Sequence, residues 1–521
     1  MTLASSNPRT HISYKWSSLP LELQLQIFEY VAGQQEHRAM GFSRYTYVSL
    51  EWQDYFEKFT FRRLLIDNSQ LARFFKMTMG EKAVRLSYIR YLCLRIKLQD
   101  YDDTECDKPE SHATINWNNQ RFTHSLKVLF DVLRRWKPSS DRDTGLILEI
   151  TAYSPGDNRR CQDAAMDYAL HENFQLEEDL ASPPGVAGFI YDKDDRDRLA
   201  PGKNWHKETT LQGLERLHGT PLALTTRKSL KEVPIVHTLW IRHQFKRGIK
   251  SSSLARILSM ALTNVTSFRL ETASDPHPQL RYFRDWNNLI TQLPHHIRHF
   301  AFNLFPRPFL PTFVFFMNAV SGPPPPSLAE KPLAEKAHHL ASLCPPADTN
   351  ALHLIQHPRK SQQPEHGSRL RQLHLEVQYN PRDGVSLFQG QMDHLLKESA
   401  VTARHLPELK ILEIWCHQRM NAFVFRYEHE KDQVTITWRA SKDWINLAEE
   451  SIQQWRRLAQ KYNVVFSVKE LPVLENPPFS VISYCDGHID RKVVYGQLKL
   501  PNLAIDPVTL ARLDIIRILV S

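Results

Sequence analysis

The chain has 521 residues, 42% hydrophobic and 24% charged, with a net charge of +9. This composition is typical of globular proteins and excludes a wholly disordered chain. The apolar runs are too short to cross a bilayer, and the basic residues are spread along the sequence rather than gathered in a patch. We therefore expect neither a membrane-spanning protein nor a nucleic-acid-binding protein.

The N-terminal sequence lacks the apolar segment of a secretory signal peptide, so we expect an intracellular protein, in the cytoplasm, the nucleus or both. Six scattered cysteines without a C-x-x-C pair argue against a disulfide framework.

Residues 1–16 are predicted to be a flexible N-terminus, and residues 17–62 a compact helical domain. Its first helix, SLPLELQLQIFEYV at 18–31, is apolar over roughly twice the arc of an ordinary surface helix. At about 100° per residue, one face carries Leu21, Leu25 and Phe28, and the adjacent face carries Leu23, Ile27, Tyr30 and Val31. The pattern is best explained if one face packs within its own domain and the other receives a partner. The alternative is a plain helical subdomain with an overfull core. A further helix is predicted within YTYVSLEWQDYFEKF, residues 45–59.

Residues 63–420 are predicted to form an irregular array of strands and helices. A short apolar pattern resembling L-x-x-L-x-L recurs, and each copy is predicted to follow a helical stretch. The copies are IRYLCL (89–94), VHTLWI (236–241), VTSFRL (265–270), IRHFAF (297–302), LRQLHL (370–375) and LKILEI (409–414), with a related strand LILEIT at 146–151. The helical stretches are predicted at 122–136, 253–262 and 283–294. The pattern predicts a degenerate leucine-rich-repeat-like body, and the alternative is an ordinary α/β domain.

Two polar or proline-rich stretches, about 154–232 and 321–369, are predicted to be loose insertions in this array. Residues 421–521 are predicted to form a small α+β cap. It comprises a hairpin at 422–440, a helix at 444–462, a strand at 464–470 and a closing element at 508–520. The predicted fold class is therefore mixed α/β.

The sequence contains no phosphate-binding glycine loop, no nucleophile elbow and no H-E-x-x-H motif. The pairs His295/His299 and His353/His357 have helical spacing, but no third metal ligand converges on them. We predict a non-catalytic protein without a cofactor or a metal site. An enzyme with an unrecognised α/β site is the rival interpretation.

The N-terminal segment resembles the F-box, whose pattern begins L-P-x-E-[LI] and ends V-[SC]-[KR]-x-W. The matching residues are Leu19, Pro20, Glu22, Leu23, Ile27, Phe28, Val48, Ser49 and Trp52. Leu50 stands where the family commonly has a basic residue. The whole chain is similar to filamentous-fungal F-box proteins with degenerate repeats after the box. The resemblance implies a three-helix F-box in which these residues bind, or support the face that binds, a Skp-type adaptor and through it a cullin.

The resemblance further implies a substrate-recognition subunit of a Skp-cullin-F-box ubiquitin ligase, in which the repeat-like region binds a protein substrate. Variable strand positions are expected to face that substrate: Arg90, Arg95, His237, Trp240, Arg269, His299, His374 and Trp415. Aromatic and arginine anchors favour Trp240, Trp415 and Arg269, with His374 as a further candidate. The alternative is an interaction scaffold with the same parts and no role in ubiquitylation. The sequence does not identify the substrate.

Overall fold

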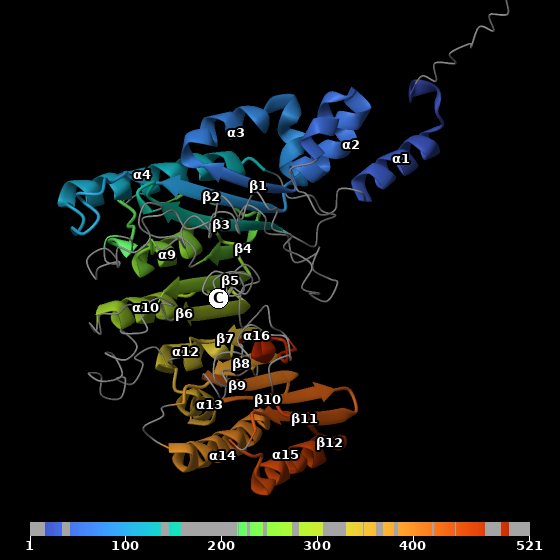
Figure 1. Ribbon diagram of the computed structural model, residues 1–521, viewed down its shortest axis with the longest axis vertical. Helices are drawn as coiled ribbons and strands as arrows, with labels where there is room; N and C mark the ends of the chain where they lie inside the picture. The colour runs from blue at the N-terminus through green and yellow to red at the C-terminus, as the bar shows by residue number, and fades with distance from the viewer. Residues whose placement is uncertain are drawn as a thin grey trace, which may run out of the picture.

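The computed structural model describes residues 16–33, 42–136, 145–157, 216, 218–226, 230–242, 247–273, 281–305, 330–346, 349–360, 368–379, 384–418, 421–442, 444–474 and 491–499. Within these residues, twelve strands form one sheet whose spatial order follows the order of the chain (Figure 1). The strands are β1 (Arg63–Asp67), β2 (Tyr91–Lys97), β3 (Leu146–Tyr153), β4 (Val236–Ile241), β5 (Ser267–Ala273), β6 (His299–Phe305), β7 (Ser342–Cys344), β8 (Gln372–Glu376), β9 (Ile411–Gln418), β10 (Asn421–Glu430), β11 (Gln433–Ala440) and β12 (Val465–Glu470).

Neighbouring strands are parallel from β1 to β9, and β11 and β12 are also parallel. The antiparallel pairs in the described sheet are β9–β10 and β10–β11, and a two-residue turn at 431–432 joins the latter pair. Parallel strands need long crossover connections, and several of these contain helices in their described parts. The protein thus has the mixed α/β class that the sequence predicted, and its sheet is mostly parallel.

The long helices form a second layer over one face of the sheet, and they too follow chain order (Figure 1). They are α3 (Leu71–Met77), α4 (His112–Leu133), α9 (Ser251–Arg256) continued by the π-helical turn η7 (Ile257–Ala261), α10 (Arg281–Thr291), α12 (Glu330–Ala337), α13 (Ala351–Lys360), α14 (Gly384–Ala403) and α15 (Glu449–Tyr462). The 3₁₀ helices η3 (Asn68–Gln70) and η4 (Gly80–Tyr88) adjoin α3. One large hydrophobic core lies between the sheet and this layer.

Side chains alternate between the two faces of each strand. In β4, Leu239 and Ile241 join the core beneath the helices, while Trp240 points to the opposite face. On that opposite face, Trp415 of β9 packs with the short helix α16 (Arg491–Tyr495) in a separate cluster. Both faces of the sheet are therefore buried over much of its length, which explains the near-continuous apolar runs in the sequence.

An N-terminal helical unit, residues 16–60 as far as they are described, precedes the sheet. It contains η1 (Trp16–Ser18), α1 (Leu21–Gly33), the 3₁₀ helix η2 (Phe42–Tyr47) and α2 (Leu50–Thr60). A buried ion pair between Glu57 of α2 and Arg85 of η4 joins the unit to the sheet, with Arg85 Nε donating to Glu57 Oε2 at 2.8 Å. The described part of this unit thus holds two α-helices and 3₁₀ turns.

The strand predictions are confirmed for β2, β3, β4, β5, β6, β8 and β9, and the hairpin β10–β11 and strand β12 lie where the sequence predicted them. The predicted helices correspond to α4, α9, α10 and α15, although α4 begins ten residues earlier than expected and α15 five residues later. The expected closing element at 508–520, the flexible start at 1–15 and most of 158–215 lie outside the described residues.

The structure differs from the prediction in two places. Within the supposed loose insertion at 321–369, residues 330–360 form α12, β7 and α13. Pro332 is tolerated because it lies in the first turn of α12, and Leu333 and Ala334 are buried in the core. The sheet also continues across the predicted boundary at residue 420, because β10–β12 belong to it.

Candidate functional site

The helical unit is built around an aromatic cluster that is separate from the main core. Phe28 of α1, Phe42 of η2 and Phe56 of α2 are buried at its centre. The ring of Phe28 stacks on Tyr55 with centroids 4.5 Å apart and meets the edge of Trp52 at 5.1 Å. These contacts fix α1 against α2. Phe28 and Trp52, two of the predicted adaptor-binding residues, therefore support the unit from within.

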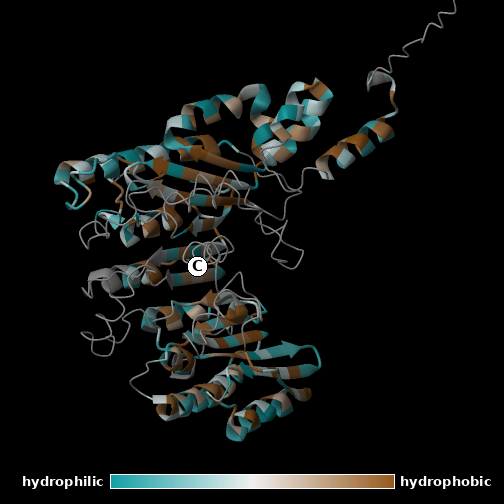
Figure 2. Cartoon of the chain, in the orientation of Figure 1, coloured by the Kyte–Doolittle hydropathy of each residue, from teal (hydrophilic) through white to brown (hydrophobic). Residues whose placement is uncertain are grey.

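The opposite face of α1 remains open. Leu23 is 45% exposed, Ile27 37% and Tyr30 68%, and all three lie on the side of the helix away from Phe28. Leu21, Leu25, Tyr47, Val48 and Leu50 are exposed as well. In Figure 2 hydrophobic colouring runs along much of α1 at the end of the molecule. We call the exposed residues Leu23, Ile27 and Tyr30 the outer face of α1.

The other predicted adaptor-binding residues lie at the starts of the two helices. Pro20 and Glu22 are exposed at the start of α1, and Leu19 is half-buried. Ser49 is the N-cap of α2, where its Oγ accepts a hydrogen bond from Trp52 N at 3.4 Å. The same hydroxyl donates to Glu51 Oε2 at 2.5 Å and lowers the pKa of that carboxyl. Ser49 thus has a structural role, which the N-cap preference of serine explains.

Of the favoured substrate-facing residues, Trp240, Arg269 and His374 follow one transverse row of the sheet, and Trp415 lies in the next row on the same face. Glu149, Trp240, Arg269 and Ala301 are register partners on β3 to β6. His374, Glu413 and Arg426 are register partners on β8 to β10. The alternation predicted from the sequence is therefore correct.

The expectation of an open surface is wrong for the four favoured residues, because Trp240, Arg269, His374 and Trp415 are all buried. Trp240 packs on Tyr91 and on the guanidinium of Arg242, whose Cζ lies 4.4 Å from the ring centroid. Trp415 packs edge-on against Tyr495 of α16, with centroids 5.1 Å apart. The alternation along a strand predicts which face of the sheet a side chain lies on, but it does not predict which other residues cover that face. These residues hold the second face of the sheet together.

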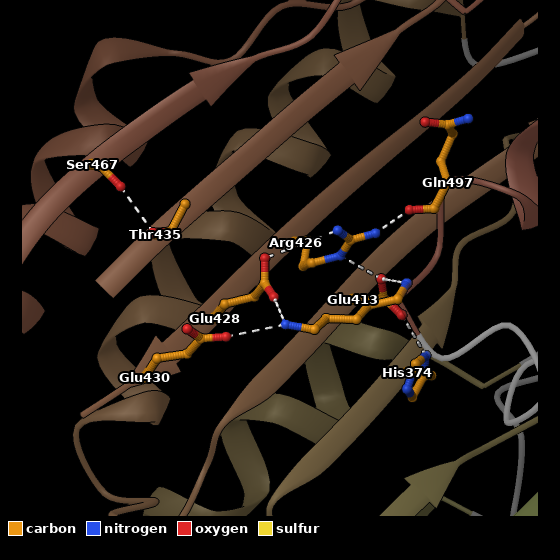
Figure 3. Close-up of polar contacts among 9 residues, drawn as sticks. His374, Glu413, Arg426, Glu428, Glu430, Thr435, Ser467 and Gln497 are labelled. Carbon is orange, nitrogen blue, oxygen red and sulfur yellow. Dashed lines mark hydrogen bonds and ion pairs between the residues drawn. The ribbon is translucent and has the colours of Figure 1, made fainter. Parts of the chain in front are cut away.

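The buried row contains two clusters of ionisable groups. In the first, Glu149 Oε2 accepts hydrogen bonds from Tyr91 Oη at 2.6 Å and from Arg242 Nη1 at 2.9 Å. In the second, Glu413 Oε1 accepts from Arg426 Nε at 2.7 Å, and His374 Nδ1 lies 3.1 Å from Glu413 Oε2 (Figure 3).

The segment 491–499 closes the second cluster from the other side. Lys499 N donates to Glu413 Oε1 at 2.7 Å, and Arg426 Nη2 donates to the carbonyl of Gln497. Burial alone would raise the pKa of Glu413. The contact with His374 and the charge of Arg426 outweigh burial, so this pKa lies below its ordinary value. We interpret both clusters as structural, because a buried charge is tolerated only when it is paired.

A third buried carboxyl, Asp157, follows β3. Its Oδ1 accepts from Tyr101 Oη at 2.9 Å and its Oδ2 from Ser154 N at 2.8 Å. Burial raises the pKa of Asp157 to about 6, even though these hydrogen bonds oppose the shift.

Within the described ranges, no group of three or more His, Cys, Asp or Glu side chains is placed to hold a metal ion. No helix in the described part of the chain is long and apolar enough to cross a membrane.

Residues 292–486 match a family of unknown function, DUF6546. The match begins directly after α10 and runs through β6–β12, so it includes the His374–Glu413–Arg426 cluster but not the N-terminal helical unit. A search of curated proteins finds no match to the chain.

Proposed function

We propose that this chain is the substrate-recognition subunit of a Skp-cullin-F-box type ubiquitin ligase. The helical unit docks a small Skp-type adaptor through α1 and the start of α2. The sheet and its helices hold a protein substrate. The chain catalyses nothing itself. It raises the effective concentration of the substrate beside the ligase by holding both at once.

The outer face of α1 is the observation that carries this proposal. Of the seventeen large apolar side chains that are exposed among the described residues, eight lie between Leu21 and Leu50. Leaving large apolar side chains in water is unfavourable by roughly 1.5–3 kcal/mol each relative to burial, so such a concentration favours a partner that covers them. The F-box resemblance of the same segment identifies the partner as a Skp-type adaptor.

The rigidity of the helical unit also suits a docking role. Phe28, Trp52 and Phe56 lock α1 and α2 together from the inner side. Little side-chain or backbone freedom is then lost when the outer face is covered, which favours affinity. The Glu57–Arg85 pair joins α2 to η4 beside the sheet, so the helical unit is also anchored to the rest of the chain.

The test is binding of the purified full chain to a Skp-type adaptor, measured by titration calorimetry. The variant Leu23→Ala/Ile27→Ala removes the outer face and keeps Phe28. We expect its dissociation constant to rise at least about tenfold, because truncated interface anchors typically cost 1–2 kcal/mol or more. The matched control is Leu387→Ala on α14, which is 54% exposed and far from α1 in the sequence; it should bind like wild type.

If the wild-type chain does not bind the adaptor, the proposal fails. If the double variant binds as tightly as wild type, the outer face is not the docking surface. An adaptor complex that forms normally but supports no ubiquitylation of any captured protein would favour the scaffold interpretation.

A further inference from the structure

A pocket of about 540 Å³ lies at the edge of the sheet where β6, β7 and β8 begin. It is distinct from the outer face of α1 and from the buried row. Its lining includes Arg298, His299, Ala341, Arg369, Arg371 and Glu408. His299 is the one substrate-facing candidate from the sequence that the structure brings to this pocket. Three arginines against one carboxylate give this lining an excess of positive charge.

The hollow has a simple origin in the register of the sheet. Arg298, Ala341 and Arg371 are the residues directly before β6, β7 and β8, and they lie side by side in one backbone ladder. Ala341 N donates to Arg298 O at 2.6 Å, and Arg371 N donates to Ala341 O at 2.8 Å. Neighbouring strands lie about 4.8 Å apart, so the two arginine backbones are about 10 Å apart with only a methyl group between them. Two long cationic side chains thus flank a gap that an alanine leaves empty.

Two of the three guanidinium groups are not neutralised by the lining. Arg371 Nε donates to Glu408 Oε2 at 2.9 Å, so the one carboxylate of the lining is paired with Arg371. Arg298 Nη1 donates to the main-chain oxygen of His339 at 3.2 Å, which orients the guanidinium without cancelling its charge. The side chain of Arg369 is exposed, and its backbone N–H donates a hydrogen bond to His338 O. Within the described residues, no carboxylate forms an ion pair with this side chain.

The surroundings of the pocket are basic as well. His295 and His339 lie edge to face with ring centroids 5.0 Å apart, and Lys336 Nζ donates to Leu293 O at 3.0 Å. Burial lowers the pKa of His339, and the nearby charges of His295, Lys336, Arg298 and Arg369 lower it further. The positive potential at neutral pH therefore comes from the arginines and Lys336 rather than from His339.

We propose that this pocket binds a phosphate monoester, with Arg298 and Arg369 donating to the phosphate oxygens and Arg371 shared between the phosphate and Glu408. The planar guanidinium matches two oxygens of a phosphate at once, which makes arginine the preferred partner for this group. The pocket is much larger than a bare phosphate ion, so there is room for the organic group that the phosphate esterifies. This proposal does not depend on adaptor docking.

A phosphorylated side chain of a protein and a small free phosphate would offer the same chemistry. The test is titration calorimetry of the full chain, without adaptor, at low ionic strength. The probes are inorganic phosphate, O-phospho-L-serine, and the peptide acetyl-Ala-phosphoserine-Ala-amide with its unphosphorylated form. Tighter binding of the phosphopeptide than of the other probes indicates a protein side chain. Binding of inorganic phosphate or phosphoserine at least as tight as that of the phosphopeptide indicates a small phosphate. No binding of any phosphorylated probe at about 10 mM, or equal binding of the unphosphorylated peptide, overturns the proposal.

Variants then assign the binding to this pocket. Arg298→Ala and Arg369→Ala should each weaken binding about tenfold or more, because a hydrogen bond to a charged group is typically worth that factor. Ala341→Leu keeps every charge but fills the gap, and it should weaken binding as well. Glu408→Gln removes the competing carboxylate and should tighten binding. The control is Arg73→Ala on α3, an exposed arginine outside the pocket.

Unchanged binding in Arg369→Ala and Ala341→Leu, or an equal loss in Arg73→Ala, would refute the assignment. Circular dichroism of each variant checks that it is folded. Arg369 and Glu408 are exposed, so their variants remain informative even if Arg298→Ala does not fold.

Discussion

The helical unit and the sheet differ in which side chains they bury and which they leave exposed. The helical unit buries three phenylalanines and leaves Leu23, Ile27 and Tyr30 in water. The sheet buries apolar residues on both faces and charged ones with them, including Glu149 and Glu413. The fold buries even charged side chains completely, whereas these three apolar side chains remain exposed. Their exposure is the observation on which the proposed docking surface rests.

The same comparison separates two kinds of polar group. In the sheet, each of these buried carboxylates is matched by an arginine at hydrogen-bond distance, as Glu149 is by Arg242. Such pairs contribute little net stability, but removing one partner is costly. At the edge of the sheet, Arg298 and Arg369 are left without an acid from the lining. The contrast distinguishes clusters that hold the fold from a pocket that is free to take a ligand.

The largest effect is expected from Phe28→Ala, which removes the centre of the small aromatic cluster. We expect the helical unit to lose about 3–5 kcal/mol of stability, as in other truncations of a buried phenylalanine. Because this cluster is separate from the main core, hydrogen–deuterium exchange should accelerate in α1 and α2 while the sheet stays protected. Tyr30→Ala, on the outer face, should change the opening free energy measured by hydrogen exchange in α1 and α2 by less than about 0.5 kcal/mol. Equal effects of the two variants would contradict the division of α1 into an inner and an outer face.

Glu413→Ala tests the buried clusters of the sheet. It leaves Arg426 and His374 without their carboxylate, and we expect a loss of about 3 kcal/mol in the free energy of unfolding, measured by urea denaturation. The control is Glu449→Ala, which breaks the exposed contact between Glu449 and Arg456 and should change stability by less than about 0.5 kcal/mol. A small effect at Glu413 would mean that its cluster is not fully desolvated.

A smaller effect is expected from pH, through Asp157. Its pKa is raised to about 6 in the folded chain, so the folded state binds the proton more tightly than the unfolded state does. The resulting stabilisation is complete at low pH and is lost as pH rises through about 6. Relative to Asp157→Asn, wild type should lose about 1 kcal/mol between pH 5.0 and pH 7.5, measured by urea denaturation at both values. A constant difference across this range would show that Asp157 does not titrate there.

Much of the sheet could be predicted because its strands repeat one apolar pattern. In VHTLWI, for example, the spacing of Val236, Leu239 and Ile241 is enough to define β4 and the face that it turns to the helices. The unit containing β7 was missed because its strand has only three residues. Its pattern reads L-A-S-L-C-P from Leu340, so a proline takes the third apolar position.

The sites were predicted less completely, for a physical reason. The outer face of α1 is a property of one helix, and its periodicity could be read from Leu23, Ile27 and Tyr30. The pocket depends on Arg298, Ala341 and Arg371, which are dozens of residues apart and meet only through strand register. Likewise, the burial of Trp415 depends on Tyr495, which follows it by eighty residues. The local sequence pattern predicts the direction of each side chain, whereas its neighbours are determined by the tertiary fold.

The agreement between strand order and chain order has a consequence for how the molecule comes apart. Each strand pairs with the strands that come before and after it in the chain, so most contacts within the sheet join neighbouring units. Stability in such an array is close to a sum of units and of the interfaces between them. Under load or in denaturant, unravelling is expected to begin at an end of the sheet and advance strand by strand. Among the described strands, β1 and β12 each pair with only one other strand. We therefore expect unravelling to start there.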